Sequence, residues 1–297
     1  MAPIATADLE RFYPIAFPKD VPTIQLEKLS LAKLLNGDEQ VAQTLFRVCC
    51  NEGFFYLDLT TDPQGRTFLN ESNELHQVAK DVFKNAPMEK KLAYKPGDPF
   101  KEHLDYGPGE LTGIHRLEDT SGEFLRLFRY PAPKDGKPLA APPTPAHTDA
   151  TSITMLFNWQ GGLQITKPKE SSPGSVEMED RDRVGEEWLY VKPEPGHVII
   201  NLGDPMVVFT NGLLKSGRHQ VVTPPGPQGA FHRYSVLTNL RPANDRPMRA
   251  LESDIIPSKE GGEEGGEEGG EEGEEVPTAL QWSLTKVKAI LERMSKK

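Results

Sequence analysis

The second half of the chain, from Glu123 onward, is a series of short apolar runs separated by clusters of Gly, Pro and Asn. Eight short strands with such punctuation are typical of a β-sandwich or jelly roll, and not of an alternating α/β fold. We therefore expect a mainly β fold with a mouth between two sheets in which a metal ion can sit. The runs are Phe124–Tyr130, Ser152–Trp159, Gly162–Thr166, Trp188–Val191, His197–Leu202, Met206–Thr210, His219–Val222 and Tyr234–Leu240.

The first half is expected to supply flanking helices. Apolar residues recur at helical spacing between Asp38 and Gly53, and again between Arg66 and Lys84. A buried strand, Phe54–Leu59, is predicted between these two helices. The apolar face of the second helix is expected to consist of Leu75, Val78, Val82 and Phe83.

The end of the chain combines a low-complexity segment with a further helix. Residues 261–275 repeat Gly and Glu, a composition that cannot bury apolar surface, and we expect a disordered insertion in a surface loop. Thr278 and Gln281 match a capping box at the start of a helix. An apolar stripe is expected to dock this helix on the main body: Leu280, Leu284, Val287, Leu291 and Met294.

These patterns predict one structural unit made of four segments. Residues 86–120 contain many Pro and Gly residues, and a long irregular stretch of this kind is more often a binding loop than a structural one. The segments are an N-terminal helix and strand region (1–120), a jelly-roll core (121–257), the disordered Gly/Glu-rich insertion (258–276) and a C-terminal helix that packs on the core (277–297).

The net charge of −10 arises mostly from the eight Glu residues of 261–275, so the rest of the chain is nearly neutral. Without a basic stripe, nucleic acid is not expected as a partner. No apolar run reaches the length of about 18 residues that a membrane span needs, and residues 1–20 do not have the pattern of a signal peptide. The two cysteines are adjacent and cannot form a disulfide framework, which favours the cytosol.

The strongest chemical signal is His147-Thr148-Asp149, which stands directly before the predicted strand that begins at Ser152. On a strand, a His and an Asp two residues apart would project from the same face. An imidazole and a carboxylate side by side make two thirds of a facial triad for non-haem Fe(II), and His219 is the best candidate for the second His. A rival pair, His103 and Asp105, lies in the irregular stretch, where no strand fixes its geometry.

A candidate anion clamp follows the second His. Arg233 and Ser235 are two residues apart on a predicted strand and are expected to share a face. A guanidinium fork matches the geometry of a carboxylate, so this pair is predicted to bind one. The alternation places His232 on the opposite face, and it is not predicted to be a ligand.

In this order the motifs resemble the isopenicillin N synthase-like branch of the Fe(II)/2-oxoglutarate-dependent dioxygenases. The resemblance rests on His147-Thr148-Asp149, Gly161-Gly162-Leu163-Gln164-Ile165, Asn201-Leu202-Gly203-Asp204, Thr210-Asn211-Gly212, Lys215-Ser216 with His219, and Arg233-Tyr234-Ser235. It departs from plant members at Phe128-Arg129-Tyr130-Pro131, where they often carry Asn-Tyr-Tyr-Pro, and the acidic repeat is not a family feature.

The resemblance implies a double-stranded β-helix (jelly roll) core with Fe(II) on His147, Asp149 and His219. It implies 2-oxoglutarate held by Arg233 and Ser235, with Tyr130 nearby, and O2 as co-substrate. The expected reaction yields succinate and CO2 while a small organic molecule of specialised metabolism is hydroxylated, desaturated or rearranged. The candidate residues for binding that molecule are Tyr106, Arg126 and Phe157.

Two alternatives remain open at this point. An oxidase similar to isopenicillin N synthase would use no 2-oxoglutarate, and Arg233 and Ser235 would then hold the substrate's own carboxylate. A non-catalytic jelly-roll binding protein would be expected to have lost a metal ligand or the clamp, and all five residues are present.

Overall fold

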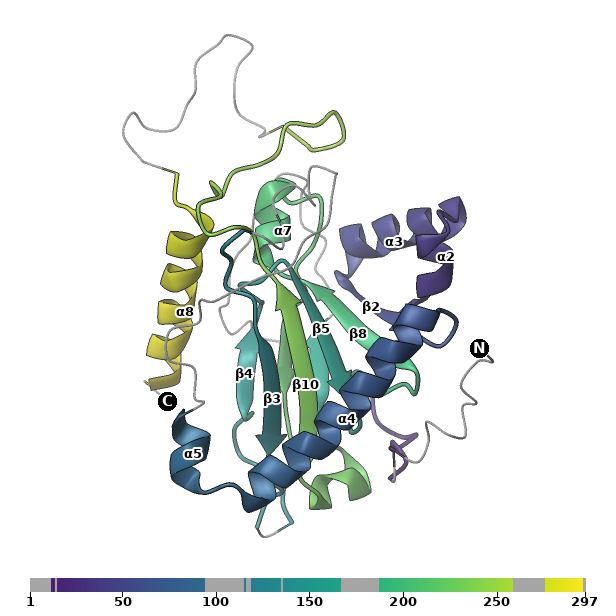
Figure 1. Ribbon diagram of the computed structural model, residues 1–297, viewed down its shortest axis with the longest axis vertical. Helices are drawn as coiled ribbons and strands as arrows, with labels where there is room; N and C mark the ends of the chain where they lie inside the picture. Colours follow the sequence, from purple (N-terminus) through teal and green to yellow (C-terminus); the bar gives the residue numbers. More distant parts are fainter. Residues whose placement is uncertain are drawn as a thin grey trace.

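The structure is a computed structural model that describes residues 12–13, 15–93, 115, 119–134, 136–166, 187–258 and 276–295. Its strands form a six-stranded sheet in the order β1-β2-β8-β5-β10-β3 and a four-stranded sheet in the order β4-β9-β6-β7 (Figure 1). The strands are β1 Lys28–Ser30, β2 Phe54–Asp58, β3 Leu125–Tyr130, β4 Thr144–His147, β5 Ile153–Asn158, β6 Leu163–Thr166, β7 Trp188–Tyr190, β8 His197–Leu202, β9 His219–Val221 and β10 Arg233–Leu240.

Short helices and one long helix surround the sheets. They are α2 Leu31–Leu35, α3 Glu39–Asn51, α4 Pro63–Asn85, α5 Met88–Ala93, α7 Asp204–Phe209, the 3-10 helix η1 Gly226–Ala230 and α8 Ala279–Ser295. The expected mainly β jelly roll with flanking helices is confirmed. Seven of the eight strands predicted from Glu123 onward are strands in the structure, as is the predicted strand Phe54–Leu59, while β1 and β4 are additional.

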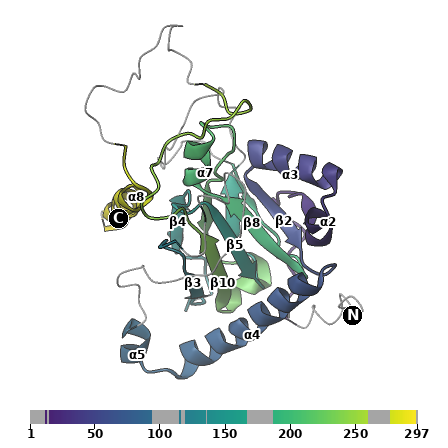
Figure 2. The ribbon, with the colours of Figure 1, turned by 45° about the horizontal axis from the view of Figure 1, so that its top comes forward.

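The six-stranded sheet has two faces with different neighbours. Its inner face packs against the four-stranded sheet through a core that includes Tyr56, Leu156, Leu163, Ile165 and Ile199. Its outer face packs under α3 and α4, as both ribbon views show (Figures 1 and 2), through a core that includes Val48, Leu69, Phe157, Ile200 and Val236. Because side chains alternate along a strand, β2, β5, β8 and β10 contribute to both cores.

Helix α3 lies where the sequence predicts it. The Asp38 side chain caps it by accepting a hydrogen bond of 3.0 Å from the backbone N–H of Val41. Gly53 follows the helix with a φ of +63°, and a Cβ there would lie 2.2 Å from the carbonyl oxygen of Lys215. Glycine is therefore required both by the backbone conformation and by the close approach of a neighbouring chain segment.

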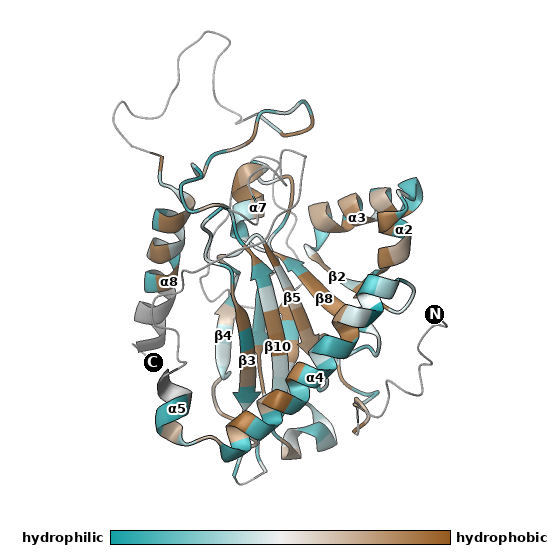
Figure 3. Ribbon diagram, in the orientation of Figure 1, coloured by the Kyte–Doolittle hydropathy of each residue, from teal (hydrophilic) through white to brown (hydrophobic). Residues whose placement is uncertain are grey.

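The predicted face of α4 is wrong at Val78 and Val82, while Leu75 packs against the outer core and Phe83 contacts the Tyr234 ring. Val78 and Val82 are 49% and 43% exposed, and the side chains that are buried instead include Arg66, Asn73 and His76. The reason lies beneath the helix, where the indole N–H of Trp159 donates to Asn73 over 2.9 Å and the indole ring stacks on His76 at 3.9 Å between centroids. The buried face of α4 is therefore partly polar and aromatic, because these side chains find partners beneath the helix. Figure 3 shows that hydrophilic and hydrophobic residues are mixed along α4.

The predicted strand Met206–Thr210 is also wrong, because this run lies mostly in helix α7. Periodicity cannot distinguish a buried strand from a short buried helix in so short an apolar run. Pro205 occupies the first turn, where its fixed φ suits a helix and its missing N–H costs nothing. The helix begins after Gly203, whose position has no room for a Cβ beside the carbonyl oxygen of Thr151.

The C-terminal helix α8 confirms the predicted cap and corrects the predicted stripe. The backbone N–H of Thr278 donates to the Gln281 side chain over 2.8 Å, and the Gln281 N–H donates to the Thr278 hydroxyl over 3.3 Å. Leu284 and Val287 are nevertheless 51% and 44% exposed. The helix docks beside the sheets (Figure 2) through another set of residues: Ala279, Trp282, Ser283 and Lys286.

Several predicted features lie outside the described residues, among them Tyr106, the pair His103 and Asp105, and the Gly/Glu repeat 261–275. The division into four segments within one structural unit therefore stays a prediction. Across the described parts of the chain, no helix combines the length and hydrophobicity that crossing a membrane requires.

Candidate active site

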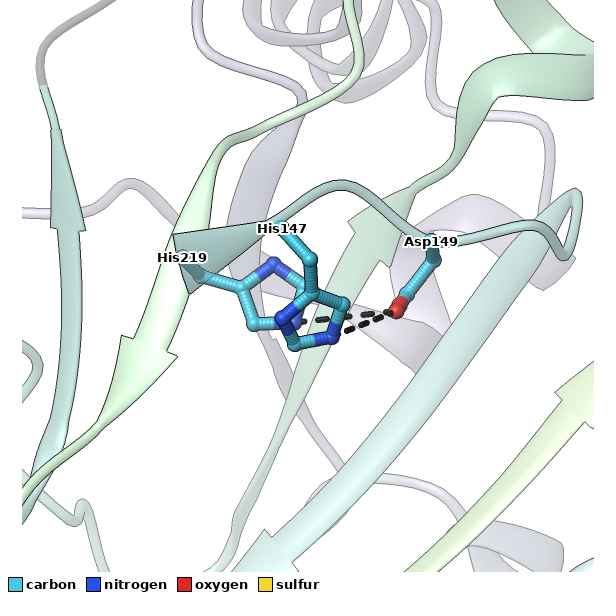
Figure 4. A group of neighbouring side chains, drawn as sticks. All are labelled: His147, Asp149 and His219. Carbon is cyan, nitrogen blue, oxygen red and sulfur yellow. Dashed lines mark ion pairs between the residues drawn. The ribbon is translucent and has the colours of Figure 1, made fainter. Parts of the chain in front are cut away.

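His147, Asp149 and His219 converge at one end of the space between the sheets (Figure 4). Nε2 of His147 lies 3.5 Å from Oδ1 of Asp149, and Nε2 of His219 lies 3.6 Å from the same oxygen. The three side chains each offer a ligand atom, and these atoms lie within 4.8 Å of one another. Two imidazoles and one carboxylate are the donor set of the facial triad of non-haem Fe(II) enzymes, so the residues fit that metal.

The strand argument that paired His147 with Asp149 is wrong in its geometry. His147 is the last residue of β4, in the small sheet, and Asp149 lies in the connection to β5, in the large sheet. The carboxylate reaches the imidazole because the chain passes from one sheet to the other at this point. His219 is the first residue of β9 and the direct register partner of His147, so strand pairing sets the two rings side by side.

Both imidazoles are fixed by backbone carbonyls. Nδ1 of His147 lies 2.8 Å from the carbonyl oxygen of Pro145, and Nδ1 of His219 lies 3.0 Å from that of Gly217. A carbonyl oxygen can only accept, so each Nδ1 carries the proton and donates. The Nε2 lone pairs are therefore available to a metal ion, and the rings are held in place before it binds.

The carboxylate of Asp149 is fixed through its second oxygen. Oδ2 accepts a hydrogen bond of 2.7 Å from the Thr154 hydroxyl and one of 2.8 Å from the Asn201 side chain. Burial raises the pKa of Asp149, but the nearby imidazoles of His219 and His147 and the Asn201 amide outweigh burial and hold it well below its usual range. The group is thus an anion whose Oδ1 faces the two histidines.

The loop that carries Asp149 is tied to α7 and α8. The backbone N–H of Asp204 donates to the carbonyl oxygen of Asp149 over 2.9 Å. The Asp204 carboxylate, only 2% exposed, forms an ion pair with Lys286 of α8 and accepts a hydrogen bond of 3.0 Å from Thr148. Lys286 also donates to the Thr148 hydroxyl over 2.9 Å, so the C-terminal helix braces the residue between two ligands.

Arg233 lies on the inner face of β10 and is 1% exposed. Its Nε donates to the carbonyl oxygen of Gly161 over 2.9 Å, and its Nη1 donates to the Ser235 hydroxyl over 3.3 Å. Nη2 is buried and has no hydrogen-bond partner among the residues that the structure describes. Burial lowers the pKa of Arg233, because the buried cation has lost its hydration. A bound carboxylate would offset this loss.

Tyr130 and Gly162 lie against the side chain of Arg233. The ring of Tyr130 lies 5.0 Å from the guanidinium carbon, and its hydroxyl lies 3.2 Å from that of Thr144 on β4. Gly162 has a φ of +105°, and a Cβ there would lie 2.6 Å from the carbonyl oxygen of Val222 and press on the Arg233 side chain. The predicted pairing of Arg233, Ser235 and Tyr130 is therefore present in space.

The candidate substrate residues have different surroundings. Arg126 is half-buried on β3, opposite Leu237, whose side chain packs in the inner core. Phe157 belongs to the outer core and makes an edge-to-face contact with Phe68 of α4 at 5.0 Å between centroids. This position favours packing for Phe157 over contact with a ligand. Tyr106 lies outside the described residues.

Sequence reasoning did not assign the supporting residues Thr154 and Lys286. Thr154 stands five positions after Asp149, a spacing with no general meaning. Lys286 is one of many lysines, and nothing in the sequence links it to Asp204. Asn201 was within a quoted motif, but its bond to Asp149 became visible only in the fold.

Comparison with known proteins identifies the family of this chain. The model of the 2OG-Fe(II) oxygenase superfamily matches residues 121–242. A 2-oxoglutarate-dependent dioxygenase of Aspergillus fumigatus is 34% identical and is matched over 85% of this chain and 84% of its own length. A second, from Gibberella zeae, is 26% identical over 82% of this chain and 87% of its own length.

Solved structures agree in fold. A 2OG-Fe(II) oxygenase family protein from Caulobacter crescentus superposes with a TM-score of 0.61 at 19% identity, covering 90% of this chain and all of that one (100%). A Neurospora crassa protein, in complex with alpha-KG and 5-formyluracil, gives 0.59 at 19% identity over 92% and 98% of the two chains. Since a relative above 30% identity spans most of both chains, this chain belongs to the 2OG-Fe(II) oxygenase superfamily and is an enzyme that uses Fe(II) and 2-oxoglutarate.

Proposed function

We propose that His147, Asp149 and His219 hold the Fe(II) ion and that Arg233, with Ser235 and Tyr130, holds the distal carboxylate of 2-oxoglutarate. The observation that carries this proposal is the state of Arg233. The guanidinium is fully buried, and its Nη2 has no partner among the described residues, a cost that a bound acceptor would remove. A carboxylate is the acceptor that a guanidinium fork fits.

The chain's own residues then perform positioning. Bound Fe(II) and 2-oxoglutarate supply the oxidising chemistry, in which O2 and 2-oxoglutarate give succinate and CO2 while the substrate is oxidised. Thr154 and Asn201 turn Oδ1 of Asp149 toward the histidines, and the carbonyls of Pro145 and Gly217 hold the imidazole rings. Three protein ligands leave the open coordination positions that catalysis needs.

The substrate in this proposal is a small organic molecule, oxidised by hydroxylation, desaturation or rearrangement in specialised metabolism. Similar folds hold such molecules: the Neurospora crassa protein was also solved with thymine, and JOX2 with 2OG, Fe and JA. Arg126 faces the inner space and is the described residue best placed to contact the substrate, and Tyr106 stays a candidate. The proposal includes a cytosolic location, which rests on the two adjacent cysteines that cannot form a disulfide framework. It includes no nucleic-acid partner, which rests on the nearly neutral charge outside residues 261–275.

Two measurements test the proposal. Fe(II) and 2-oxoglutarate added together under anaerobic conditions should give a charge-transfer absorption, and oxygen should then release succinate. Arg233→Met should raise the concentration of 2-oxoglutarate that this absorption requires, while His103→Ala should leave iron binding intact. Iron binding without any consumption of 2-oxoglutarate would favour the oxidase, and loss of iron in His103→Ala would mean that the wrong histidine was chosen.

A further inference from the structure

A second concentration of unused hydrogen-bond donors lies on the inner face of the large sheet, away from Arg233. Arg126 of β3 is the register partner of Leu237, and Leu237 packs in the inner core. Directly paired residues of antiparallel strands share a face, so Arg126 points to the inner side. Its neighbour Leu127 packs in the outer core, as alternation requires.

Arg126 has an incomplete set of partners. Its guanidinium lies 3.8 Å above the centre of the Phe124 ring, and it has no ion pair with any described residue. Arg241 is close enough that Arg126 lowers its pKa, after burial as the larger cause, to about 10. Glu123 counteracts this shift, and its carboxylate accepts a hydrogen bond of 3.4 Å from the Arg241 backbone N–H. Two guanidinium cations therefore lie close to each other, and burial lowers the pKa of Arg126 as well.

Asn239 adds a neutral donor to this group. Its Oδ1 accepts a hydrogen bond of 2.9 Å from the backbone N–H of Phe124, while its Nδ2 is buried and has no partner in the part of the chain that the structure describes. Asn239 pairs with Thr154 of β5, and Thr154 holds Asp149. The unused amide N–H thus stands beside the residue that supports the metal-ligand carboxylate.

We infer that the substrate carries a carboxylate, which Arg126 binds with help from the side-chain amide of Asn239. The inference rests on the proposed function, since it places this group in the substrate space of the same site. Arg126 is a half-buried cation without an ion pair to any described residue, and its planar fork matches a carboxylate. Four residues of β10 separate the partners of Arg126 and Tyr130, roughly 13 Å along the strand. That is longer than 2-oxoglutarate, so the two anion sites serve two molecules.

The test uses pairs of small probes that differ only in charge: phenylacetate, indole-3-acetate and cinnamate, each beside its primary amide. Binding is measured by ligand-observed NMR on the full chain with Zn(II), after 2-oxoglutarate has been added to saturation so that Arg233 is occupied. At least one carboxylate should bind more tightly than its amide by about tenfold to a hundredfold, the range of a charge-assisted hydrogen bond. Arg126→Met should abolish that preference and leave amide binding unchanged.

Arg129→Met is the matched control. It removes the same charge from the same strand, but Arg129 faces outward and lies 5.5 Å from the ring of Phe83 on α4. Asn239→Asp gives a second variant that keeps the side-chain shape and adds a negative charge beside Arg126, so it too should abolish the carboxylate preference. Arg126→Lys should keep part of it, because a charge without the planar fork remains.

Equal binding of carboxylates and amides, absence of probe binding at millimolar concentration, or a preference that survives Arg126→Met would each overturn the inference. Failure of the proposed function gives a different result. It would appear as a missing charge-transfer absorption with Fe(II) and 2-oxoglutarate in the wild-type chain, measured separately from probe binding.

Discussion

The two faces of the six-stranded sheet are made from the same strands and have opposite characters. On β10, Arg233, Ser235 and Asn239 point inward, while Val236 packs in the outer core and Tyr234 lies 5.8 Å from the His76 ring of α4. The inner face holds buried donors that lack partners among the described residues, and the outer face packs mainly through apolar side chains and aromatic contacts. Because successive side chains of β10 point to opposite faces, residues that bind ligands alternate along this strand with residues that stabilise the fold.

The largest expected effect is at the metal ligands on the inner side. His219→Ala should abolish metal binding and all iron-dependent activity, because two protein ligands no longer define the facial site. Its free energy of unfolding should change much less. Titration with Co(II), followed by its absorption, measures binding, and His232→Ala serves as control because His232 accepts a hydrogen bond from the Ala132 backbone and is not a ligand. Full activity in His219→Ala would contradict the ligand assignment.

The outer face should respond in the reverse way. Leu69 lies in the outer core and is 3% exposed. Leu69→Ala should lower the free energy of unfolding by about 2–5 kcal/mol, because a cavity remains under α4. The apparent affinity for 2-oxoglutarate should not change in the fraction that stays folded. Urea denaturation gives the energy, and exposed Val78→Ala on the same helix should cost little. If Leu69→Ala and Val78→Ala lowered the free energy of unfolding equally, the assignment of the buried face of α4 would be wrong.

Arg233→Met should raise the concentration of 2-oxoglutarate needed for half-maximal succinate release about a hundredfold, the loss of a buried charge-assisted pair. Iron affinity should stay nearly constant, since Arg233 contacts no metal ligand. Arg233→Lys should recover part of the affinity. A variant that loses iron and 2-oxoglutarate to the same degree would show that Arg233 supports the fold and not the cosubstrate.

Lys286→Met should lower metal affinity about tenfold by leaving Asp204 as a buried, unpaired carboxylate beside Thr148. The matched control is Lys288→Met, which removes the same charge from an exposed position on the same helix. Calorimetric titration with Mn(II) measures both variants. Equal affinities for wild type and Lys286→Met would show that α8 does not brace the metal loop.

The smallest expected effect concerns His76 on the outer side. Burial, and to a lesser degree Lys80, lowers the pKa of His76 to about 3, against an unfolded value near 6.5. Above pH 6.5 neither state is protonated; as the pH falls below this value the unfolded state takes up the proton, and stability is lost by at most ~1.4 kcal/mol per pH unit. His76→Phe should reduce this loss between pH 6.5 and 5 in thermal unfolding curves, without changing succinate release at pH 7.5.

If the loss of stability between pH 6.5 and 5 is the same in His76→Phe as in the wild type, groups other than His76 cause the acid sensitivity. This comparison also separates the two faces of the sheet. Stability should follow the titration of His76, while the inner site keeps its activity above pH 6.5.

By itself, the sequence determined the chemistry of the site and most of the strands. His147, Asp149, His219, Arg233 and Ser235 were assigned from residue type, order and spacing, because few side chains can supply such a donor set. The fold brings all five to the inner side of the sheets. The cap of α8 and the end of α3 were also predictable, since both are local hydrogen-bonding problems.

Only the tertiary structure decided what each face packs against. Periodicity shows that a helix has an apolar side, but Val78 of α4 and Leu284 of α8 are exposed because the elements beneath offered better partners to His76 and Lys286. The supports of Asp149 are likewise long-range, as Asn201 lies 52 residues away in the chain. Sequence spacing encodes neither relation, because both depend on how separate elements meet in space.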